Sequence, residues 1–349
     1  MKISLVTPIP WTAGTTYSQV YREAIEQVRY AEELGFDCVW VTEHHFATHG
    51  INPSVFSFLG YVAGITTRIR LGTAVAVVPL YHPLRLAEDV ATVDIVSNGR
   101  LELGIGSGYR HDEFKGFRVA QEDSRAMLIE EVEILLRAWA GEPFAYHGHY
   151  HTIPEGTVVR PVPVQKPYPP MWVAGVSRPT LEWIAQRGYR WMGATTTASF
   201  AELGRLRAHF DQALIKAGRT PAEGESYVHF PIFVSDQPSA EIKRELEPAL
   251  TWLAKAVSSG GTIYHTHTAA QGSRLPLQQF NFDAYQEQSA VVGPAEVCWQ
   301  KITDWWRQLR FSHMTCAFGL GLPHAATMKN MERFARSLMP ALRELEAQV

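Results

Sequence analysis

Short runs of β-branched residues alternate with longer segments of helical period along most of this chain. This alternation predicts strand–helix units and a parallel sheet rather than a β-sandwich. We count eight units, and closing eight parallel strands leaves no exposed edge, which favours a (β/α)8 TIM barrel of the α/β class over an open doubly wound sheet. The predicted strands are Lys2–Thr7, Asp37–Val41, Ile69–Val77, Leu101–Ile105, Met171–Ala174, Arg190–Gly193, Val228–Ser235 and Ser312–Ala317.

Glycine and proline positions predict where helices begin and end. The first helix spans roughly Ser18 to Leu34, with a serine cap at its start and a stop at Gly35, a residue that adopts the left-handed conformation without strain. A proline in a first helical turn costs nothing, because the amide it lacks has no partner there. Four prolines fit such positions: Pro83, Pro179, Pro294 and Pro323.

Two segments interrupt the repeat. Residues 141–170 are rich in Pro and Gly, and they predict a hairpin followed by an extended connection. Residues 258–293 are polar and aromatic with little periodicity, and insertions of this length are usually lids or disordered. We therefore predict one barrel domain over residues 1–349 with insertions at about 141–170 and 258–293, the second a possible active-site lid.

Charge and cysteine content exclude several classes of partner and site. The net charge of −3 and the absence of a Lys/Arg run argue against a nucleic-acid partner or an anionic-membrane patch. The three cysteines, Cys38, Cys298 and Cys316, form no CxxC pair, which argues against a disulfide framework or a structural zinc site. With no apolar run long enough for a membrane span, we expect a cytoplasmic protein.

The active site of a βα barrel lies at the carboxyl ends of its strands. Four polar or glycine-rich clusters follow strands two to five and should therefore converge on one face. They are Glu43–His44–His45–Phe46, Ala74–Val75, Gly106–Ser107–Gly108–Tyr109–Arg110 and Gly175–Val176–Ser177.

The histidines of the first cluster are candidates for acid–base chemistry, because imidazole titrates near neutral pH. Adjacent strand residues point to opposite sides, so only one of His44 and His45 can face the barrel axis. A hydrogen-bonded structural histidine is the alternative. Zinc is disfavoured, because the HExxH and three-histidine spacings are absent.

A second group of histidines lies outside these clusters. His147, His149 and His151 have the spacing that places three side chains on one strand face, where a metal site is geometrically conceivable. A surface hairpin is the better interpretation of this stretch. The same holds for His265 and His267, and we predict no metal.

Two of the clusters resemble anion sites. Bare amides in a glycine-rich loop such as 104–108 approach a phosphate closely, with a turn that merely closes the strand as the alternative. Gly175–Val176–Ser177, followed by Thr180, leads into a helix whose first amides face the barrel mouth, with an ordinary serine cap as the alternative. Arg110 and Arg125 are candidates for charge-assisted bonds to phosphate. Together these elements indicate a phosphorylated cofactor or substrate.

From Glu43–His44–His45–Phe46 onward the chain resembles the bacterial luciferase-like family of flavin-dependent monooxygenases and oxidoreductases. The likeness recurs in the same order over some 330 residues, which is more specific than any one motif. The further matching stretches are Asn52–Pro53, Val78 to Asp89, Ser97–Asn98–Gly99–Arg100, Asp123–Ser124–Arg125–Ala126, Ser177 to Trp183, Val292–Gly293–Pro294, Thr315 to Phe318 and Met331 to Phe334.

The resemblance implies a barrel that binds reduced FMN, with a cis peptide between Ala74 and Val75 against the flavin ring and His44 as catalytic base. It implies phosphate contacts from Arg125, Ser177 and Thr180 and from the backbone of Gly175 and Val176. Glu43, Ser107, Gly108 and Arg110 complete the predicted cofactor contacts.

Three positions depart from luciferase itself. Ser107 replaces its second phosphate arginine, Gly106 its reactive cysteine and Val176 a glutamate. Light emission is therefore not expected, and Arg110 is a candidate replacement for the missing arginine.

The function that follows is a two-component monooxygenase. It would take reduced FMN from a separate flavin reductase and insert one atom of O2 into a small organic substrate that the sequence does not identify. The family also implies a homodimer and a lid over the site, to which Trp252, Tyr264 and Phe280 are candidate pocket residues. The alternatives are hydride transfer with the deazaflavin F420 on the same fold, a noncatalytic flavin-binding barrel and a metal hydrolase.

Overall fold

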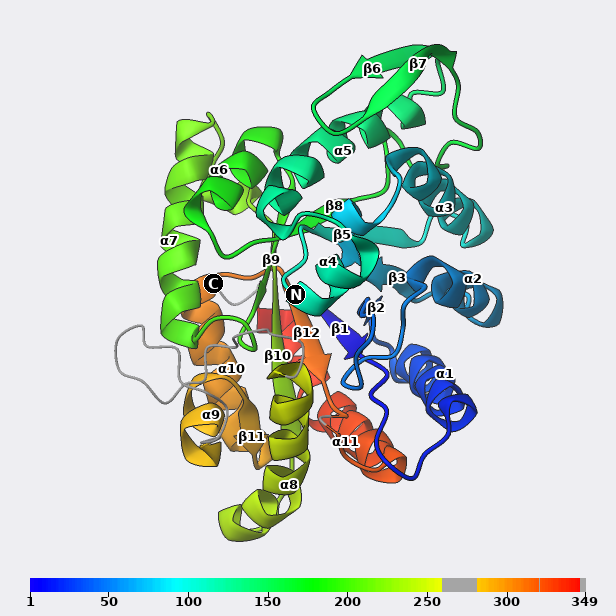
Figure 1. Cartoon of the computed structure of the whole chain (residues 1–349). Coiled ribbons are helices and arrows are strands. Elements are labelled where there is room, and N and C mark those ends of the chain that lie inside the picture. Colours follow the sequence, from blue (N-terminus) through cyan, green and yellow to red (C-terminus); the bar gives the residue numbers. More distant parts are fainter. Residues whose placement is uncertain (259–280, 320, 346–349) are drawn as a thin grey trace.

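The computed structural model describes residues 1–258, 281–319 and 321–345, and in these ranges the chain forms a closed parallel barrel surrounded by helices (Figure 1). Hydrogen-bonded neighbours follow the order β10, β12, β1, β2, β3, β5, β8, β9, and pairing of β9 with β10 closes the ring. The barrel strands are β1 (Lys2–Thr7), β2 (Cys38–Val41), β3 (Arg70–Thr73) continued by β4 (Ala76–Val77), β5 (Leu101–Gly106), β8 (Met171–Ala174), β9 (Arg190–Ala194), β10 (Ser226–Val234) and β12 (His313–Ala317). All eight predicted strands are confirmed.

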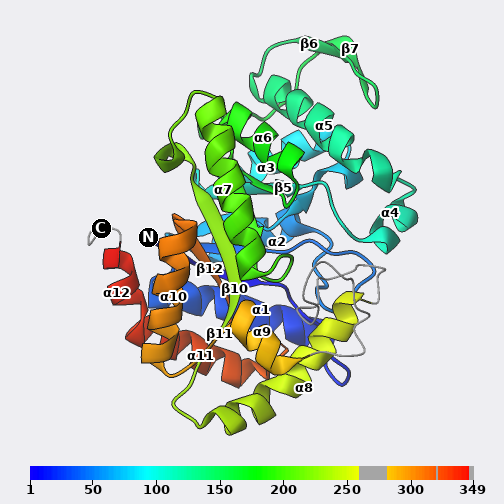
Figure 2. The ribbon, with the colours of Figure 1, turned by 90° about the vertical axis from the view of Figure 1, so that its left-hand side faces the viewer.

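The α-helices cover the outside of the barrel (Figures 1 and 2). They are α1 (Tyr17–Leu34), α2 (Val55–Ile65), α3 (Pro83–Val96), α4 (His111–Phe117), α5 (Ser124–Trp139), α6 (Arg178–Arg187), α7 (Phe200–Lys216), α8 (Ser239–Ser258), α9 (Phe282–Gln288), α10 (Ala295–Leu309), α11 (His324–Ser337) and α12 (Met339–Glu344). Single 3₁₀ turns lie at η1 (Val78–Leu80), η2 (Gln121–Asp123) and η3 (Pro221–Glu223). Among the described helices, none is both long and apolar enough to cross a membrane.

The ends of the first helix show which sequence signals were correct. Gly35 has a φ of 87° and ends α1, as predicted. The cap at its start is Thr16, whose hydroxyl accepts a hydrogen bond from the amide of Gln19, so the predicted serine cap is wrong by two residues. Pro83 and Pro179 lie in the first turns of their helices, whereas Pro294 and Pro323 directly precede α10 and α11.

The buried side chains form two clusters. The larger cluster joins the strands to the surrounding helices, and the smaller one joins strand residues to α8 and α9. Three aromatic rings pack together inside the barrel. The ring centroid of Trp40 lies 5.7 Å from that of Trp172 and 5.3 Å from that of Tyr227. Gly72 makes room for this packing, because a Cβ atom there would lie 2.1 Å from the Trp40 ring.

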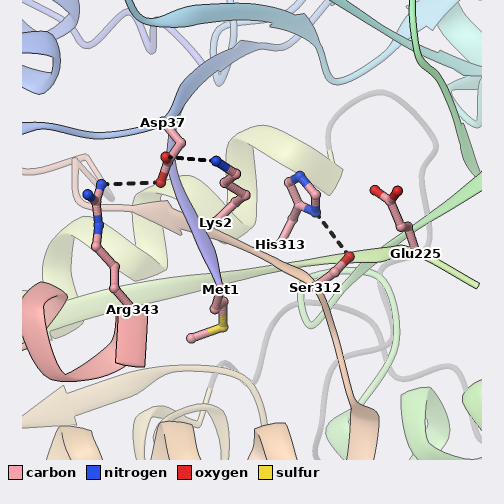
Figure 3. Close-up of a pocket in the computed structure, with 7 residues that line it drawn as sticks. All are labelled: Met1, Lys2, Asp37, Glu225, Ser312, His313 and Arg343. Carbon is pink, nitrogen blue, oxygen red and sulfur yellow. Dashed lines mark hydrogen bonds and ion pairs between the residues drawn. The ribbon is translucent and has the colours of Figure 1, made fainter. Parts of the chain in front are cut away.

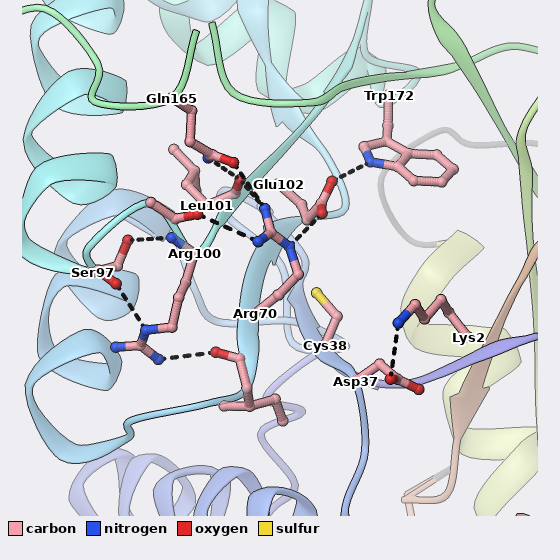
Figure 4. Close-up of polar contacts among 12 residues, drawn as sticks. Lys2, Asp37, Cys38, Arg70, Ser97, Arg100, Leu101, Glu102, Gln165 and Trp172 are labelled. Atoms are coloured by element: carbon pink, nitrogen blue, oxygen red, sulfur yellow. Dashed lines mark hydrogen bonds and ion pairs between the residues drawn. The ribbon is translucent and has the colours of Figure 1, made fainter.

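A charged cluster holds the amino end of the barrel together (Figure 4). The Glu102 carboxylate accepts a hydrogen bond from the Arg70 guanidinium and another, at 2.7 Å, from the indole Nε1 of Trp172. The guanidinium of Arg190 lies 3.5 Å from the same carboxylate and 3.0 Å from that of Glu225. These bonds join β3, β5, β8 and β9 at the end opposite the predicted site.

A cavity of about 370 Å³ opens at the same end (Figure 3). Asp37 lies between two cations, 3.6 Å from the Lys2 ammonium and 3.3 Å from the Arg343 guanidinium. Glu225, also on the rim, pairs with Arg190, and the cavity belongs to the stabilising end of the barrel.

The segment 141–170 forms the predicted hairpin, with β6 (Phe144–His147) antiparallel to β7 (Thr152–Thr157) (Figure 2). The Glu130 carboxylate fastens it to α5 by accepting hydrogen bonds from the amides of His149, Tyr150 and His151. Of the second insertion, α9 and β11 (Val291–Gly293) are described, and β11 pairs in parallel with β10. Residues 259–280 of the predicted lid lie outside the described residues.

Candidate active site

His44 lies in the loop after β2 and forms a buried pair with a glutamate. Its Nδ1 is 3.2 Å from Oε1 of Glu113, and the two side chains are 11% and 2% exposed. A carboxylate can only accept, so Nδ1 carries the hydrogen and the lone pair of the neutral ring is on Nε2. The pair thus orients the imidazole in the way that the acid of a catalytic triad orients its histidine.

Glu113 was not predicted, and it lies in the first turn of α4. The same carboxylate oxygen also accepts a hydrogen bond from the His45 amide at 3.0 Å, which fixes the loop that carries His44. No apolar residue marks the start of a helix in this stretch, yet α4 begins at His111. The signal available was the acidic pair Asp112 and Glu113, typical of a helix N-terminus.

Arg110 is fully buried beside this pair. Its guanidinium lies 2.7 Å from the Asp112 carboxylate and 3.6 Å from that of Glu113. In this arrangement Arg110 balances the charge of Glu113. A phosphate contact from Arg110, as the resemblance suggests, would require these pairings to rearrange.

Glu43 is also buried, and its carboxylate joins three segments. It accepts hydrogen bonds from the Tyr81 hydroxyl at 2.6 Å and from the Val77 amide at 3.4 Å, and it lies 3.1 Å from Nε2 of His45. Burial, and then the negative charge of Glu43, raise the pKa of Tyr81 above its ordinary value. His44 and His45 thus bind different carboxylates, and Glu43 links the end of β2 to the chain that follows β3.

The peptide bond between Ala74 and Val75 is cis, as the resemblance implied. A Cβ atom at Gly106 would lie 2.8 Å from the Val75 side chain and 3.6 Å from Cβ of Ala174, so the end of β5 packs closely against the cis peptide segment and the end of β8. Gly108 has a φ of +78°, and a Cβ there would lie 2.7 Å from Val77. Close packing against Val75 accounts for Gly106, packing against Val77 and Phe114 accounts for Gly108, and Ser107, between them, is partly exposed.

The predicted phosphate residues converge at the first turn of α6. Nε of Arg125, from the first turn of α5, lies 3.3 Å from the Thr180 hydroxyl, and the Ser177 hydroxyl lies 2.9 Å from the same oxygen. Within the described part of the chain, Ser177 precedes α6 without capping it through its side chain, which argues against the ordinary serine cap. Gly175 lets the loop approach, because a Cβ there would lie 2.6 Å from Thr180. Val176 lies beside this cluster with an exposed side chain.

The histidines of the insertion belong to the hairpin. His147 ends β6, His149 lies in the turn, and Nε2 of His151 is 2.7 Å from the buried Glu131 carboxylate, so the interpretation as a surface hairpin is confirmed. Burial raises the pKa of Glu131 to about 7. Over residues 1–258, 281–319 and 321–345, no three His, Cys, Asp or Glu side chains are grouped to hold a metal. His265 and His267 lie outside these ranges.

One of the three predicted pocket aromatics is described. The ring of Trp252, on α8, lies beside Gly321, where an added Cβ would be 3.3 Å away. Tyr264 and Phe280 lie outside the described residues. The role of all three stays a prediction.

A closed parallel barrel with an oriented histidine at the carboxyl ends of its strands has the arrangement of a barrel enzyme. Residues 1–313 match the family of luciferase-like monooxygenases, and the chain belongs to this family. It is accordingly an enzyme of the luciferase-like monooxygenase and oxidoreductase class.

Relatives and solved structures add detail. Over 203 residues the chain is 32% identical to the oxygenase component of the flavin-dependent trigonelline monooxygenase of Acinetobacter baylyi, covering 58% of this chain and 56% of that protein. The crystal structure of monooxygenase RslO1 from Streptomyces bottropensis matches with a TM-score of 0.85 and 25% identity, covering 98% of this chain and all of that one. An F420-dependent secondary alcohol dehydrogenase in complex with an F420–acetone adduct shares the fold, with a TM-score of 0.77 and 18% identity over 98% and 99% of the two chains.

Proposed function

We propose that this enzyme is an FMNH2-dependent monooxygenase that receives reduced flavin from a separate reductase and inserts one oxygen atom of O2 into a small organic substrate. The relative named as the oxygenase component of a flavin-dependent monooxygenase supports the flavin, the oxygen chemistry and the separate reductase. The likeness to RslO1 over almost the whole chain supports a monooxygenase.

The observation that carries the proposal is the cluster of Arg125, Ser177 and Thr180 at the N-terminus of α6. A guanidinium, two hydroxyls and the positive end of a helix dipole together suit a phosphate dianion. The exposed side chains of Arg125 and Ser177 leave the cluster open to a ligand. Backbone amides of Gly175 and Val176 would complete the contacts to the FMN phosphate.

The residues at the other predicted end of the cofactor suit a flat ring system. Ala74, Gly106 and Ala174 present small side chains or none at neighbouring strand ends, and Gly106 lies close to both Val75 and Ala174. Reduced FMN bound here would supply the electrons for O2. Glu43 stabilises the segment after Val75, because its carboxylate accepts hydrogen bonds from the amide of Val77 and the hydroxyl of Tyr81.

His44 provides the acid–base chemistry in this proposal. Glu113 holds the hydrogen on Nδ1, so Nε2 takes a proton from the reacting group and later returns it or passes it to water. The buried guanidinium of Arg110 lies 3.6 Å from the Glu113 carboxylate and balances its negative charge. The chain thus binds, orients and moves protons, and the cofactor carries out the oxygen chemistry.

F420-dependent hydride transfer is the second candidate, because the fold is shared with an F420-dependent dehydrogenase. The His44–Glu113 pair serves either chemistry, since each needs a proton donor or acceptor beside the ring. A noncatalytic flavin-binding barrel fits less well, because it does not explain why Glu113 orients His44.

The test is an anaerobic titration of the whole chain with photoreduced FMN and, separately, with reduced F420, followed by a pulse of O2. Tight binding of reduced FMN and a transient absorbance change that appears only with O2 support the monooxygenase. Preferential binding of F420 without an oxygen-dependent transient overturns it in favour of hydride transfer, and binding of FMN without turnover over a substrate panel indicates the noncatalytic barrel.

Three further predictions accompany this proposal. We infer that residues 1–349 act as one domain, that the enzyme is a homodimer and that it works in the cytoplasm. Light scattering of the purified chain checks the second of these, because a monomer mass would contradict it.

A further inference from the structure

Tyr109 stands at the reactive side of His44. Its hydroxyl oxygen lies 3.5 Å from Nε2 of His44, and the two rings meet edge to face with centroids 5.9 Å apart. Because Nδ1 is held by Glu113, Nε2 is the nitrogen that exchanges protons. The inference rests on the proposed function, in which His44 exchanges protons. A group beside Nε2 can receive or supply those protons.

The backbone around Tyr109 is fixed on both sides. Gly108 precedes it with a φ of +78°, and its close approach to Val77 and Phe114 leaves no space for a side chain. The fully buried Arg110 follows it. The side-chain amide of Gln121, in η2, donates to the Tyr109 carbonyl at 3.2 Å. Gly108, Arg110 and η2 therefore hold the backbone of Tyr109 in place.

Exposure differs sharply between the two rings. The His44 side chain is 11% exposed, whereas Tyr109 is 41% exposed. Within the described ranges, the other charged or titratable groups that face His44 are Glu113, with Arg110 behind it, and His49, whose ring centroid is 4.3 Å away. Burial, followed by the charges of His44 and Arg110, lowers the pKa of His49 to about 2, so this neighbour does not take up protons near neutral pH. Tyr109 is therefore the neighbour of His44 with a route to solvent.

We propose that Tyr109 relays protons between His44 Nε2 and water. As the protonated ring gives up its hydrogen, the Nε2–H bond breaks and a bond to the phenolic oxygen forms, while the phenol releases its own hydrogen to water. The same steps run in reverse when His44 takes up a proton from water. No electron is transferred, and the phenol is neutral before and after the step.

The first experiment needs neither cofactor nor turnover. In 15N-histidine-labelled full-length chain, the Nε2 resonance of His44 should move in Tyr109→Phe, which keeps the ring and removes the hydroxyl, and it should stay in place in Tyr61→Phe on α2. An unmoved His44 resonance in Tyr109→Phe overturns the proposal, whatever the cofactor proves to be.

The second experiment measures turnover with reduced FMN, O2 and an accepted substrate. We expect Tyr109→Phe to lower kcat about tenfold, to shift the pH profile of kcat and to reduce the solvent deuterium isotope effect, with flavin affinity unchanged. Adding Tyr109→Phe to His44→Ala should cause no further loss, because the relay acts through His44. Equal losses in both backgrounds, or wild-type kcat and pH profile in Tyr109→Phe, would show that the phenol only packs. A chain inactive with FMN but with the expected shift of the His44 resonance would instead refute the proposed function and leave the contact in place.

Discussion

Replacing Arg125 by alanine tests the phosphate end of the site most directly. Arg125 is exposed, and it contacts Thr180 at 3.3 Å and the Pro179 carbonyl at 3.0 Å. Neither bond is buried, so the loss of both should cost the folded chain little. The substitution therefore removes the cationic donor that α5 places beside the first turn of α6, with small effect on the barrel.

The expected loss of affinity follows from the kind of bond. A hydrogen bond to a charged group contributes about 1.5–3 kcal/mol, and about 1.4 kcal/mol corresponds to a tenfold change in Kd. Arg125→Ala should therefore weaken the binding of reduced FMN about 10-fold to 150-fold. Riboflavin has the same ring without the phosphate, so its Kd should change by less than about twofold.

Anaerobic fluorescence or absorbance titrations of both flavins provide the assay. Arg137→Ala is the matched control, because Arg137 is an exposed arginine near the other end of α5, where it contacts the Ala145 carbonyl and the Tyr146 ring. Its removal should leave both flavin constants unchanged. Thermal unfolding of the two variants establishes that they are equally folded.

Two outcomes would refute the reasoning. If Arg125→Ala weakens FMN and riboflavin by the same factor, Arg125 acts on the ring or on the shape of the site and not on the phosphate. If neither constant changes, the phosphate binds elsewhere, and the proposal loses its main support.

The remaining predictions concern catalysis and stability. His44→Ala should lower turnover about a hundredfold or more with nearly intact flavin affinity, and unchanged steady-state rates would remove His44 from the mechanism. Glu102→Gln should lower the free energy of unfolding by about 2 kcal/mol in urea titrations, because it weakens the charge-assisted hydrogen bonds from the partly exposed Arg70 and from the Trp172 indole, and an unchanged midpoint would show that the amino-end cluster contributes nothing. Burial lowers the pKa of His313 to about 3 and that of His229 to about 4, from 6.5. Because the unfolded chain binds these protons below about pH 6.5 and the folded chain does not, stability should be full above pH 6.5 and fall by about 1.4 kcal/mol per pH unit for each ring as the pH drops towards 4. Urea unfolding at several pH values checks this, and a flat profile over that range would contradict it.

The sequence predicted the parts of the site that depend on one strand end at a time. Each barrel strand is followed by its own loop, so strand positions alone bring the loop after β2 and the start of α6 to one face. The phosphate contact of Arg125 was predicted from the family resemblance, because nothing in its neighbouring sequence distinguishes it from other exposed arginines. The structure then places it against Thr180, from another helix.

The parts that were missed depend on pairings between distant side chains. Glu113 meets His44 across 69 positions, and Tyr81 meets Glu43 across 38. Such pairs are selected by the packing of α4 and η1 against the barrel, and no spacing rule links their members. For the same reason the sequence could not show that Arg110 is buried against carboxylates.

The two ends of this barrel are specialised for different tasks. The bonds of Glu102 to Arg70 and Trp172 fix the strands at one end, and every residue proposed to bind or react lies at the other. Loops exchanged beyond the carboxyl ends would leave those bonds untouched. Laboratory evolution of substrate choice can therefore exchange loop sequences with those of relatives. The part of the folding free energy that the amino-end bonds contribute does not depend on these loops.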